Sequence, residues 1–341
     1  MRRIAHDRMS KRVGFTLVEL LTVITIIGIL SAISITTVRA SIASARATQT
    51  RTTIAKIDAV LTPIYEKYQY RRIALDDTNL AIESKLDRVP ARIFAMRDLL
   101  RCDLPCSEAE LLEPSAIYNA GAGSLATSLQ KSYITSVNRA LNKTSVVGDM
   151  GSGNAYTANA ELLYLVITNA DPEARLAFTD REIADTDGNG LFEFVDGWGR
   201  PICWMRWAPG LTRSDRQPQS YGSGATIDKE DADPFDPLGF LDNWRQSSGD
   251  YYALNGREMP AGWFLVPYVF SAGPDGKYGL VMPDVVRSEV NGDEEQGVAD
   301  ASLRSVSDML DPFSGLSLTF GEPDSSDKAH LDNLDNHTLV R

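Results

Sequence analysis

The sequence predicts an α+β fold in which one long N-terminal helix packs against a head built on a small antiparallel sheet. Three observations predict it. An apolar run fills residues 15–35, apolar residues at helical spacing continue to about residue 75, and short strand-like segments follow much later in the chain. The first half of the helix is expected to span a membrane, because about 20 apolar residues suffice to cross a bilayer.

One acidic residue, Glu19, lies inside the apolar run. An ionised carboxylate within a membrane span is costly and needs a partner, and the sequence offers none nearby. If the chain is cut after Gly14, Phe15 becomes a new N-terminus, and its positive amine is one helical turn from Glu19. We therefore expect Glu19 to pair with this amine in its own or a neighbouring subunit, which favours lateral assembly of helices.

The segment Gly14-Phe15-Thr16-Leu17-Val18-Glu19 resembles the signal of type IV pilins and type II secretion pseudopilins. The resemblance implies that a prepilin peptidase cleaves after Gly14 and methylates Phe15, and that Glu19 directs assembly. It also implies a pilin-like fold, with other pilin or pseudopilin subunits, the inner-membrane assembly machinery and membrane lipid as partners. The chain departs from the family pattern at Thr36, where many members have a proline.

Two other interpretations of the N-terminus remain open. Ala43-Ser44-Ala45 resembles the small-residue cleavage site of a secretory signal, although the apolar run is long for such a signal and its acid fits badly. The run could also be an uncut signal anchor in which Glu19 has no special role.

Residues 39–75 predict an amphipathic continuation of the same helix. They contain no glycine, and Pro63 is their only proline. Apolar residues recur at spacings of three to four, and the opposite face is basic. A helix from residue 15 to residue 75 would be about 90 Å long.

The segment 76–160 looks like an insertion relative to a small pseudopilin. Residues 82–100 have a helical pattern that Pro90 is expected to interrupt, and residues 124–141 predict an amphipathic helix. Residues 148–153 predict a loop, and residues 160–167 fit either a helix or a strand.

Residues 185–196 have the spacing of a calcium-binding loop. Oxygen-bearing side chains and one backbone carbonyl occupy the ligand positions, with glycine at the sharp turn. The expected ligands are Asp185, Asp187, Asn189, Leu191 through its carbonyl, Glu193 and Asp196. The alternative is a turn rich in Asp and Asn between two secondary-structure elements, which the same residues favour.

Two further motifs are similar to the major pseudopilin of type II secretion. Residues 196–201 resemble the turn that enters its sheet, and residues 202–207 predict a strand. Residues 263–270 predict another strand, and residues 271–276 resemble a loop that contributes to its calcium site. The resemblance implies that Asp275 is a calcium ligand, whereas a glycine-rich hairpin turn is the alternative.

The remaining segments are polar. Residues 213–249, rich in proline and aspartate, predict an exposed or disordered loop. The tail at residues 332–337 is expected to cover a site or to be disordered. Cys102 and Cys106 bracket three residues, a spacing that fits a small disulfide loop, two reduced thiols in a turn, or half of a metal site.

Together these features divide the chain into a leader at 1–14, a transmembrane and assembly helix at 15–38, its amphipathic continuation at 39–75, and a head at 76–341. The head is expected to hold the inserted helical segment (76–160) and the calcium-loop and sheet region (161–320). Five basic residues in the leader favour a cytoplasmic N-terminus, so the head is expected outside the cytoplasm. The protein would then be a single-pass protein of a bacterial inner membrane, with its head in the periplasm or in an extracellular fibre.

Charge and missing motifs limit the function. The net charge is −12, and the leader carries five bases and one acid, so the rest of the chain is at −16. This charge argues against nucleic acid as a partner and fits cation binding. We find no common hydrolase or nucleotide-binding motif. The sequence therefore predicts a non-enzymatic structural subunit of a type II secretion pseudopilus or type IV pilus-like fibre. The alternatives are a tip subunit that acts as an adhesin or cargo-binding module, and a membrane-anchored periplasmic hydrolase.

Overall fold

The computed structural model describes residues 16–73, 88–112, 126–143, 150–208, 211, 216, 233, 235–236, 266–280 and 333–337. The chain divides into two compact units, Met1–Ala45 and Arg46–Arg341. The described part of the first unit is helical, and the second unit, called the head below, contains the sheets and the apolar core.

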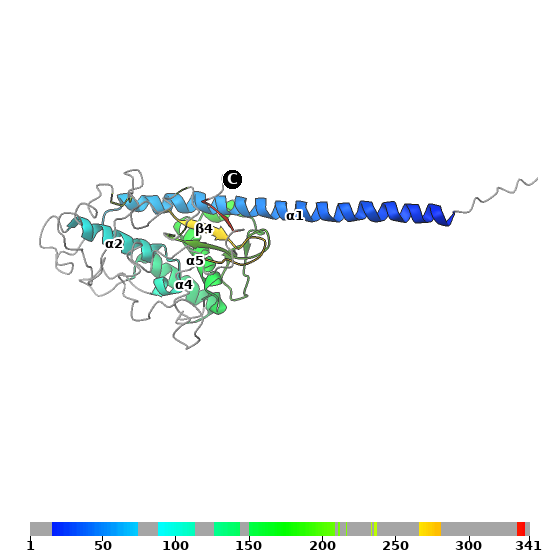
Figure 1. Cartoon of the computed structure of the whole chain (residues 1–341). Coiled ribbons are helices and arrows are strands. Elements are labelled where there is room, and N and C mark those ends of the chain that lie inside the picture. The colour runs from blue at the N-terminus through cyan, green and yellow to red at the C-terminus, as the bar shows by residue number, and fades with distance from the viewer. Residues whose placement is uncertain are drawn as a thin grey trace, which may run out of the picture. The chain divides into compact units, whose positions relative to one another are not determined.

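The long N-terminal helix is confirmed as α1, Leu17–Lys67 (Figure 1). A 3-10 turn, η1 at Tyr68–Tyr70, follows it, and the backbone is extended at Arg71. The helix therefore ends about eight residues before the expected position. Pro63 lies within α1, close to its end.

The described part of the head contains four shorter helices: α2 (Arg88–Asp103), α3 (Glu108–Leu112), α4 (Ser128–Leu141) and α5 (Ala155–Ala170). Two 3-10 turns, η2 (Met150–Gly153) and η3 (Ala174–Ala177), flank α5. The expectation that Pro90 interrupts a helix is wrong. Pro90 is the third residue of α2, where its missing N–H costs nothing because first-turn N–H groups have no partner within the helix.

The strands form two small antiparallel sheets. β1 (Ile183–Ala184) pairs with β2 (Glu193–Phe194), and the second sheet has the order β3 (Ile202–Met205), β4 (Tyr268–Ser271), β5 (Leu334–Asp335). The register places Cys203 opposite Phe270 and Ser271 opposite Leu334. The polar tail is thus an edge strand rather than a cover or a disordered segment, because its backbone completes the ladder on β4.

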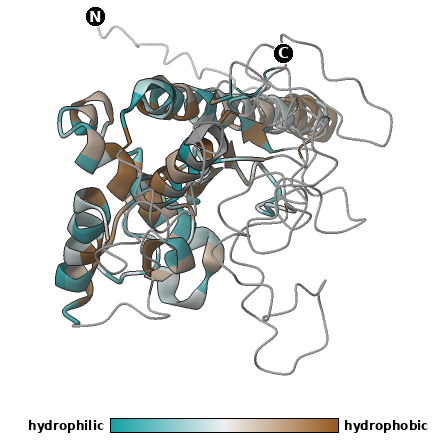
Figure 2. Ribbon diagram, turned by 90° about the vertical axis from the view of Figure 1, so that its left-hand side faces the viewer, coloured by the Kyte–Doolittle hydropathy of each residue, from teal (hydrophilic) through white to brown (hydrophobic). Residues whose placement is uncertain are grey.

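Apolar residues cover both faces of β3. Ile202 and Trp204 belong to a large cluster that also contains Ile54, Ile57 and Leu61 of α1 and much of α5. Cys203 and Met205 point to the opposite face and join a smaller cluster with residues of β4. Side chains alternate along a strand, so a strand that is apolar throughout is buried on both sides. Figure 2 shows the apolar residues of the helices and strands meeting in the interior of the head.

Part of the 213–249 segment is buried, contrary to its interpretation as an exposed or disordered loop. Phe235 packs edge-on against Tyr65 of α1, with ring centroids 5.4 Å apart. Asp233 forms an ion pair with Arg97 of α2, and both side chains are buried. Asp233 is thus the partner of a buried base, Arg97, and the sequence did not indicate this pairing.

Candidate functional site

The apolar helix begins with a reciprocal pair of hydrogen-bonded residues, Thr16 and Glu19. The backbone N–H and the hydroxyl of Thr16 donate to Glu19 Oε2 at 2.9 and 2.8 Å, and the N–H of Glu19 donates to Thr16 Oγ1 at 3.2 Å. This is a capping box, which satisfies N–H groups that have no partner within the helix. Gly14 and Phe15 lie outside the described residues, so their roles in cleavage and methylation stay predictions.

The capping box partly satisfies the carboxylate of Glu19. The expectation that the sequence offers this carboxylate no neighbour is wrong, because Thr16 supplies two donors three residues away. Both bonds end on the same oxygen, Oε2, and both donors are uncharged. They reduce the cost of the carboxylate but leave its negative charge without a positive partner.

The described part of the first unit exposes a largely apolar surface. Its large apolar side chains are between 44 and 79 % exposed, and they are Leu17, Val18, Leu20, Leu21, Val23, Ile24, Ile26, Ile27, Ile29, Leu30, Ile33, Ile35, Val38 and Ile42. Among the described helices, α1 is the one whose length and composition suit a membrane crossing. The hydroxyls of Thr22, Thr25 and Ser34 donate to carbonyls of the preceding turn, so these polar groups are also satisfied within the helix.

The predicted calcium loop is the connection of the β1–β2 hairpin. Asp185 shapes it, because its carboxylate accepts hydrogen bonds from the N–H groups of Gly188, Asn189 and Gly190 at 2.7 to 3.1 Å. Gly188 and Gly190 have φ of +77° and +92°, a conformation that glycine adopts without strain. Asp185 therefore folds the loop around its own side chain.

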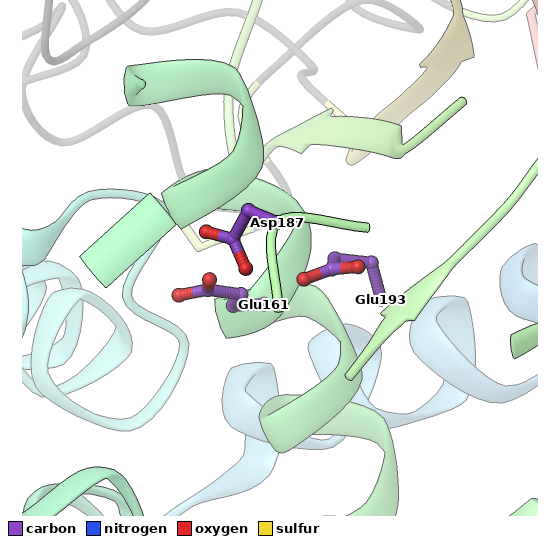
Figure 3. Close-up of side chains that lie close together, drawn as sticks. All are labelled: Glu161, Asp187 and Glu193. Atoms are coloured by element: carbon purple, nitrogen blue, oxygen red, sulfur yellow. The ribbon is translucent and has the colours of Figure 1, made fainter. Parts of the chain in front are cut away.

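Three carboxylates converge where this loop meets α5 (Figure 3). Asp187 comes from the loop, Glu193 from β2 and Glu161 from α5, and one oxygen of each lies within 4.8 Å of the others. Glu161 and Glu193 are fully buried. The side-chain amide of Asn189 bridges two members, donating to Glu161 Oε1 at 2.7 Å and to Asp187 Oδ2 at 3.1 Å. We call Glu161, Asp187 and Glu193 the acid cluster.

Burial and mutual repulsion raise the pKa values of two carboxyl groups in the acid cluster, those of Glu161 and Glu193. Burial raises the pKa of Glu161 to about 8; hydrogen bonds from Asn189 and Gly151 lower it in part, and the charges of Asp187 and Glu193 raise it further. Burial likewise raises the pKa of Glu193 to about 7, against hydrogen bonds from Thr186. In the described part of the chain, no Lys, Arg or His forms an ion pair with any of the three carboxylates.

Comparison with protein families gives a match at the N-terminus. Residues 9–35 match the prokaryotic N-terminal methylation motif, so the matched segment contains the Thr16–Glu19 capping box and most of the exposed apolar surface. This is the N-terminal signal of type IV pilins and pseudopilins. Comparison with curated proteins and with solved structures found no match.

The methylation signal and the structure together describe what kind of protein this is. The match supports a type IV pilin-like or pseudopilin precursor. The fold combines a long apolar N-terminal helix with small antiparallel sheets. Its N-terminal helix fits a single-pass membrane anchor. The signal implies a substrate of prepilin peptidase that assembles with other pilin subunits, and hence a structural subunit rather than an enzyme.

Asp196 and Asp275, two further predicted ligands, are not members of the acid cluster. Asp196 caps the turn before β3: its Oδ1 accepts from the N–H groups of Trp198 and Arg200, and its Oδ2 accepts from the hydroxyl of Ser271 at 2.7 Å. Asp275 is exposed in the turn after β4, where it accepts from the N–H of Lys277 at 2.8 Å. Leu191 is buried in the apolar core, and its N–H donates to Asn189 Oδ1.

Cys102 and Cys106 are buried and do not form a disulfide in the structure. The thiol of Cys106 donates to Glu110 Oε2 at 3.2 Å, and burial raises its pKa well above the ordinary range. The disulfide between them stays a prediction.

Sequence reasoning missed Glu161, the member of the acid cluster that comes from α5. Its signal resembles that of Glu19: it is the one acid in the apolar stretch Ala158–Ile167, which is buried except at Tyr164. An acid in such a stretch needs a specific partner, and that requirement could have directed attention to it.

Proposed function

We propose that this chain is a structural subunit of a type II secretion pseudopilus or a type IV pilus-like fibre, into which it assembles through α1. The observation that supports the proposal is the methylation signal, which coincides with the start of an exposed apolar helix and with the capping box on Glu19. Subunits that bury such helices against one another would remove this surface from lipid during assembly.

Prepilin peptidase would cut between Gly14 and Phe15 and methylate the new terminal amine. The cut leaves Phe15 attached to Thr16, so the N–H that caps Glu19 remains an amide. The methylated amine of Phe15 keeps its positive charge. Because Thr16 binds Glu19 at Oε2, the second oxygen, Oε1, can accept the amine of a neighbouring subunit. That contact would set the axial register of subunits in the fibre.

The same proposal sets the orientation and the partners. The basic leader favours a cytoplasmic N-terminus, which places the head outside the cytoplasm, in the periplasm or in an extracellular fibre. An inner-membrane assembly machine would then extract α1 from lipid as each subunit joins the fibre.

Intact mass of the membrane-extracted protein tests the processing step. The expected product begins at Phe15 and carries one added methyl group. A Gly14→Leu variant in the same cells should keep residues 1–14 and lack the methyl group. A wild-type protein that begins at Met1, or at a residue near Ala45, would contradict the proposal.

A role at the fibre tip is the second candidate, favoured by the helices α2 to α5 that the head carries beside its sheets. Such a subunit would present the head as an adhesin or a cargo-binding module. Quantitative mass spectrometry of sheared fibres separates the two roles, because a tip subunit is rare in long fibres and a major subunit dominates them.

A further inference from the structure

We propose that the acid cluster binds one Ca²⁺ ion, held by Glu161, Asp187 and Glu193, and that this ion joins the β1–β2 hairpin to α5. The site differs from the loop that the sequence predicted. Glu161 from α5 takes the place of Asp185 and Asp196 as a ligand, because its carboxylate lies together with those of Asp187 and Glu193 and theirs do not. The proposal does not depend on the fibre role of the chain.

The geometry suits a single ion. Each of the three side chains offers one oxygen, and these oxygens lie within 4.8 Å of one another. Ca²⁺ binds oxygens at about 2.3–2.6 Å, so two oxygens on opposite sides of one ion are about 4.6–5.2 Å apart. Figure 3 shows the three carboxylates close together, each on a separate segment.

An unpaired oxygen is the second observation that points to a ligand. Glu193 is fully buried, and its Oε2 accepts from the N–H of Thr186 at 2.8 Å. Its Oε1 is buried as well and has no hydrogen-bond donor. Leaving a carboxylate oxygen buried without a donor or a cation is costly. A cation bound by Glu193 would compensate the charge of this partly unsatisfied carboxylate.

The described surroundings of the acid cluster supply uncharged hydrogen-bond donors. The amide nitrogen of Asn189 lies between Glu161 and Asp187, and the backbone N–H of Gly151 donates to both oxygens of Glu161 at 3.0 and 3.1 Å. These donors hold the carboxylates in place but carry no net charge. Asp185 fixes the loop from its other side, so Asp187 reaches the acid cluster on a preformed turn.

The chemistry of the three ligands favours Ca²⁺ over other metal ions. All three ligands are carboxylate oxygens, which favour hard cations over zinc or copper. Mg²⁺ requires a tight octahedron at about 2.0–2.1 Å, whereas Ca²⁺ accepts irregular arrangements at longer distances. Ligands from a helix, a strand and a loop form an irregular arrangement, which favours Ca²⁺.

Calorimetric titration of CaCl₂ into the metal-stripped full chain in detergent micelles tests the proposal. We expect one Ca²⁺ per chain, and at least tenfold weaker binding in Glu161→Gln and in Asp187→Asn. Glu173→Gln is the matched control, because Glu173 is exposed in the turn after α5. MgCl₂ should bind at least tenfold more weakly than CaCl₂.

Thermal unfolding in EDTA separates loss of the ion from loss of the fold. Without metal, Glu161→Gln keeps the size of the side chain and adds no charge to the acid cluster, so its melting temperature should equal or exceed that of the wild type. Adding Ca²⁺ should raise the melting temperature of the wild type and of Glu173→Gln and leave that of Glu161→Gln unchanged.

Three outcomes would overturn the proposal. The first is a wild-type chain that does not bind Ca²⁺. The second is a Glu161→Gln or Asp187→Asn variant that binds Ca²⁺ as tightly as the wild type. The third is loss of Ca²⁺ binding in Asp275→Asn together with normal Ca²⁺ binding in Glu161→Gln. This result would place the ion in the turn after β4.

Discussion

The backbone N–H of Gly197 donates a hydrogen bond to the hydroxyl of Thr50, with 2.9 Å between the two atoms. The same hydroxyl donates to the carbonyl of Arg46 one turn earlier in α1, also at 2.9 Å. The turn between β2 and β3 thus lies directly on the backbone of α1. A Cβ atom at position 197 would be 2.4 Å from the carbonyl oxygen of Arg46, closer than such atoms can approach.

Gly197→Ala should therefore lower the stability of the head by about 2–3 kcal/mol, because α1 or the turn must shift to admit the methyl group. Thermal or urea unfolding in detergent micelles measures this loss. Gly199→Ala is the comparison: it has φ of +82° but no atom within 4 Å of an added Cβ, so backbone strain of about 1 kcal/mol is its main cost. Equal losses in the two variants would show that the turn does not pack tightly on α1.

His337 should make the head sensitive to acid. Burial lowers its pKa to about 4, and the charge of Arg216 acts in the same direction, while Asp58 and the carbonyl of Pro267 oppose it. The folded state therefore keeps this histidine neutral, whereas the unfolded chain protonates it near pH 6.5. Its contribution is complete above pH 6.5 and is lost as the pH falls toward 4, by roughly 3 kcal/mol at most.

Unfolding measured between pH 8 and pH 4 checks this expectation. His337→Gln should lose less stability than the wild type over that range, whatever its stability at pH 8. The nearby carboxylates Asp58 and Asp335 are present in both proteins, so the difference in slope isolates the histidine. Parallel pH profiles would contradict the assignment.

The buried ion pair between Glu110 and Arg206 should be expensive to break from one side. Glu110 accepts from the guanidinium of Arg206 and from the N–H of Cys106, and both charged side chains are buried. Glu110→Ala would leave a buried positive charge without its partner, which costs about 3–5 kcal/mol. Glu110→Met combined with Arg206→Met should cost clearly less than the sum of the two single changes, because it removes both charges.

Asp180→Asn provides the control for the buried pair. Asp180 is 99 % exposed and pairs with Arg175 at the surface, so its loss should change the free energy of unfolding by less than about 1 kcal/mol. Additive single and double variants at Glu110 and Arg206 would mean that the two side chains are not coupled.

Glu19 should be required for assembly through its charge and not only through its hydrogen bonds. Glu19→Gln can still accept from Thr16 but cannot attract a terminal amine, and Glu19→Val can do neither. We expect both variants to be processed and inserted in the membrane, yet to enter sheared fibres at less than a tenth of the wild-type level.

Thr25→Val is the control, since it removes a polar group of the same helix whose hydroxyl bonds only to the preceding turn. It should assemble normally. A Glu19→Gln subunit that assembles as well as the wild type would show that the capping box is sufficient and that no amine pairs with Glu19.

Local sequence patterns predicted several secondary-structure elements of the head. They did not predict which distant residues these elements contact. The helix at α4 follows from its apolar spacing and from Thr127, whose hydroxyl accepts from the N–H of Gln130. The strand at Leu334–Asp335 could not be predicted, because two residues are too few to show a periodicity. Asp233 looked like part of a solvated loop, and only the buried Arg97 explains its position.

The sequence by itself determined the signal at the N-terminus, the apolar helix and the acid at position 19. A membrane anchor and a helix cap depend on residues within a few positions of one another, so their chemistry can be followed along the chain. Only the tertiary structure decided which acids meet. Asp185, Asp187, Glu193 and Asp196 are equally plausible ligands along the chain, but folding the hairpin against α5 joins Asp187 and Glu193 to Glu161 and turns Asp196 toward Ser271. The position of a carboxylate relative to distant residues depends on how helices and strands pack, and local spacing does not encode that packing.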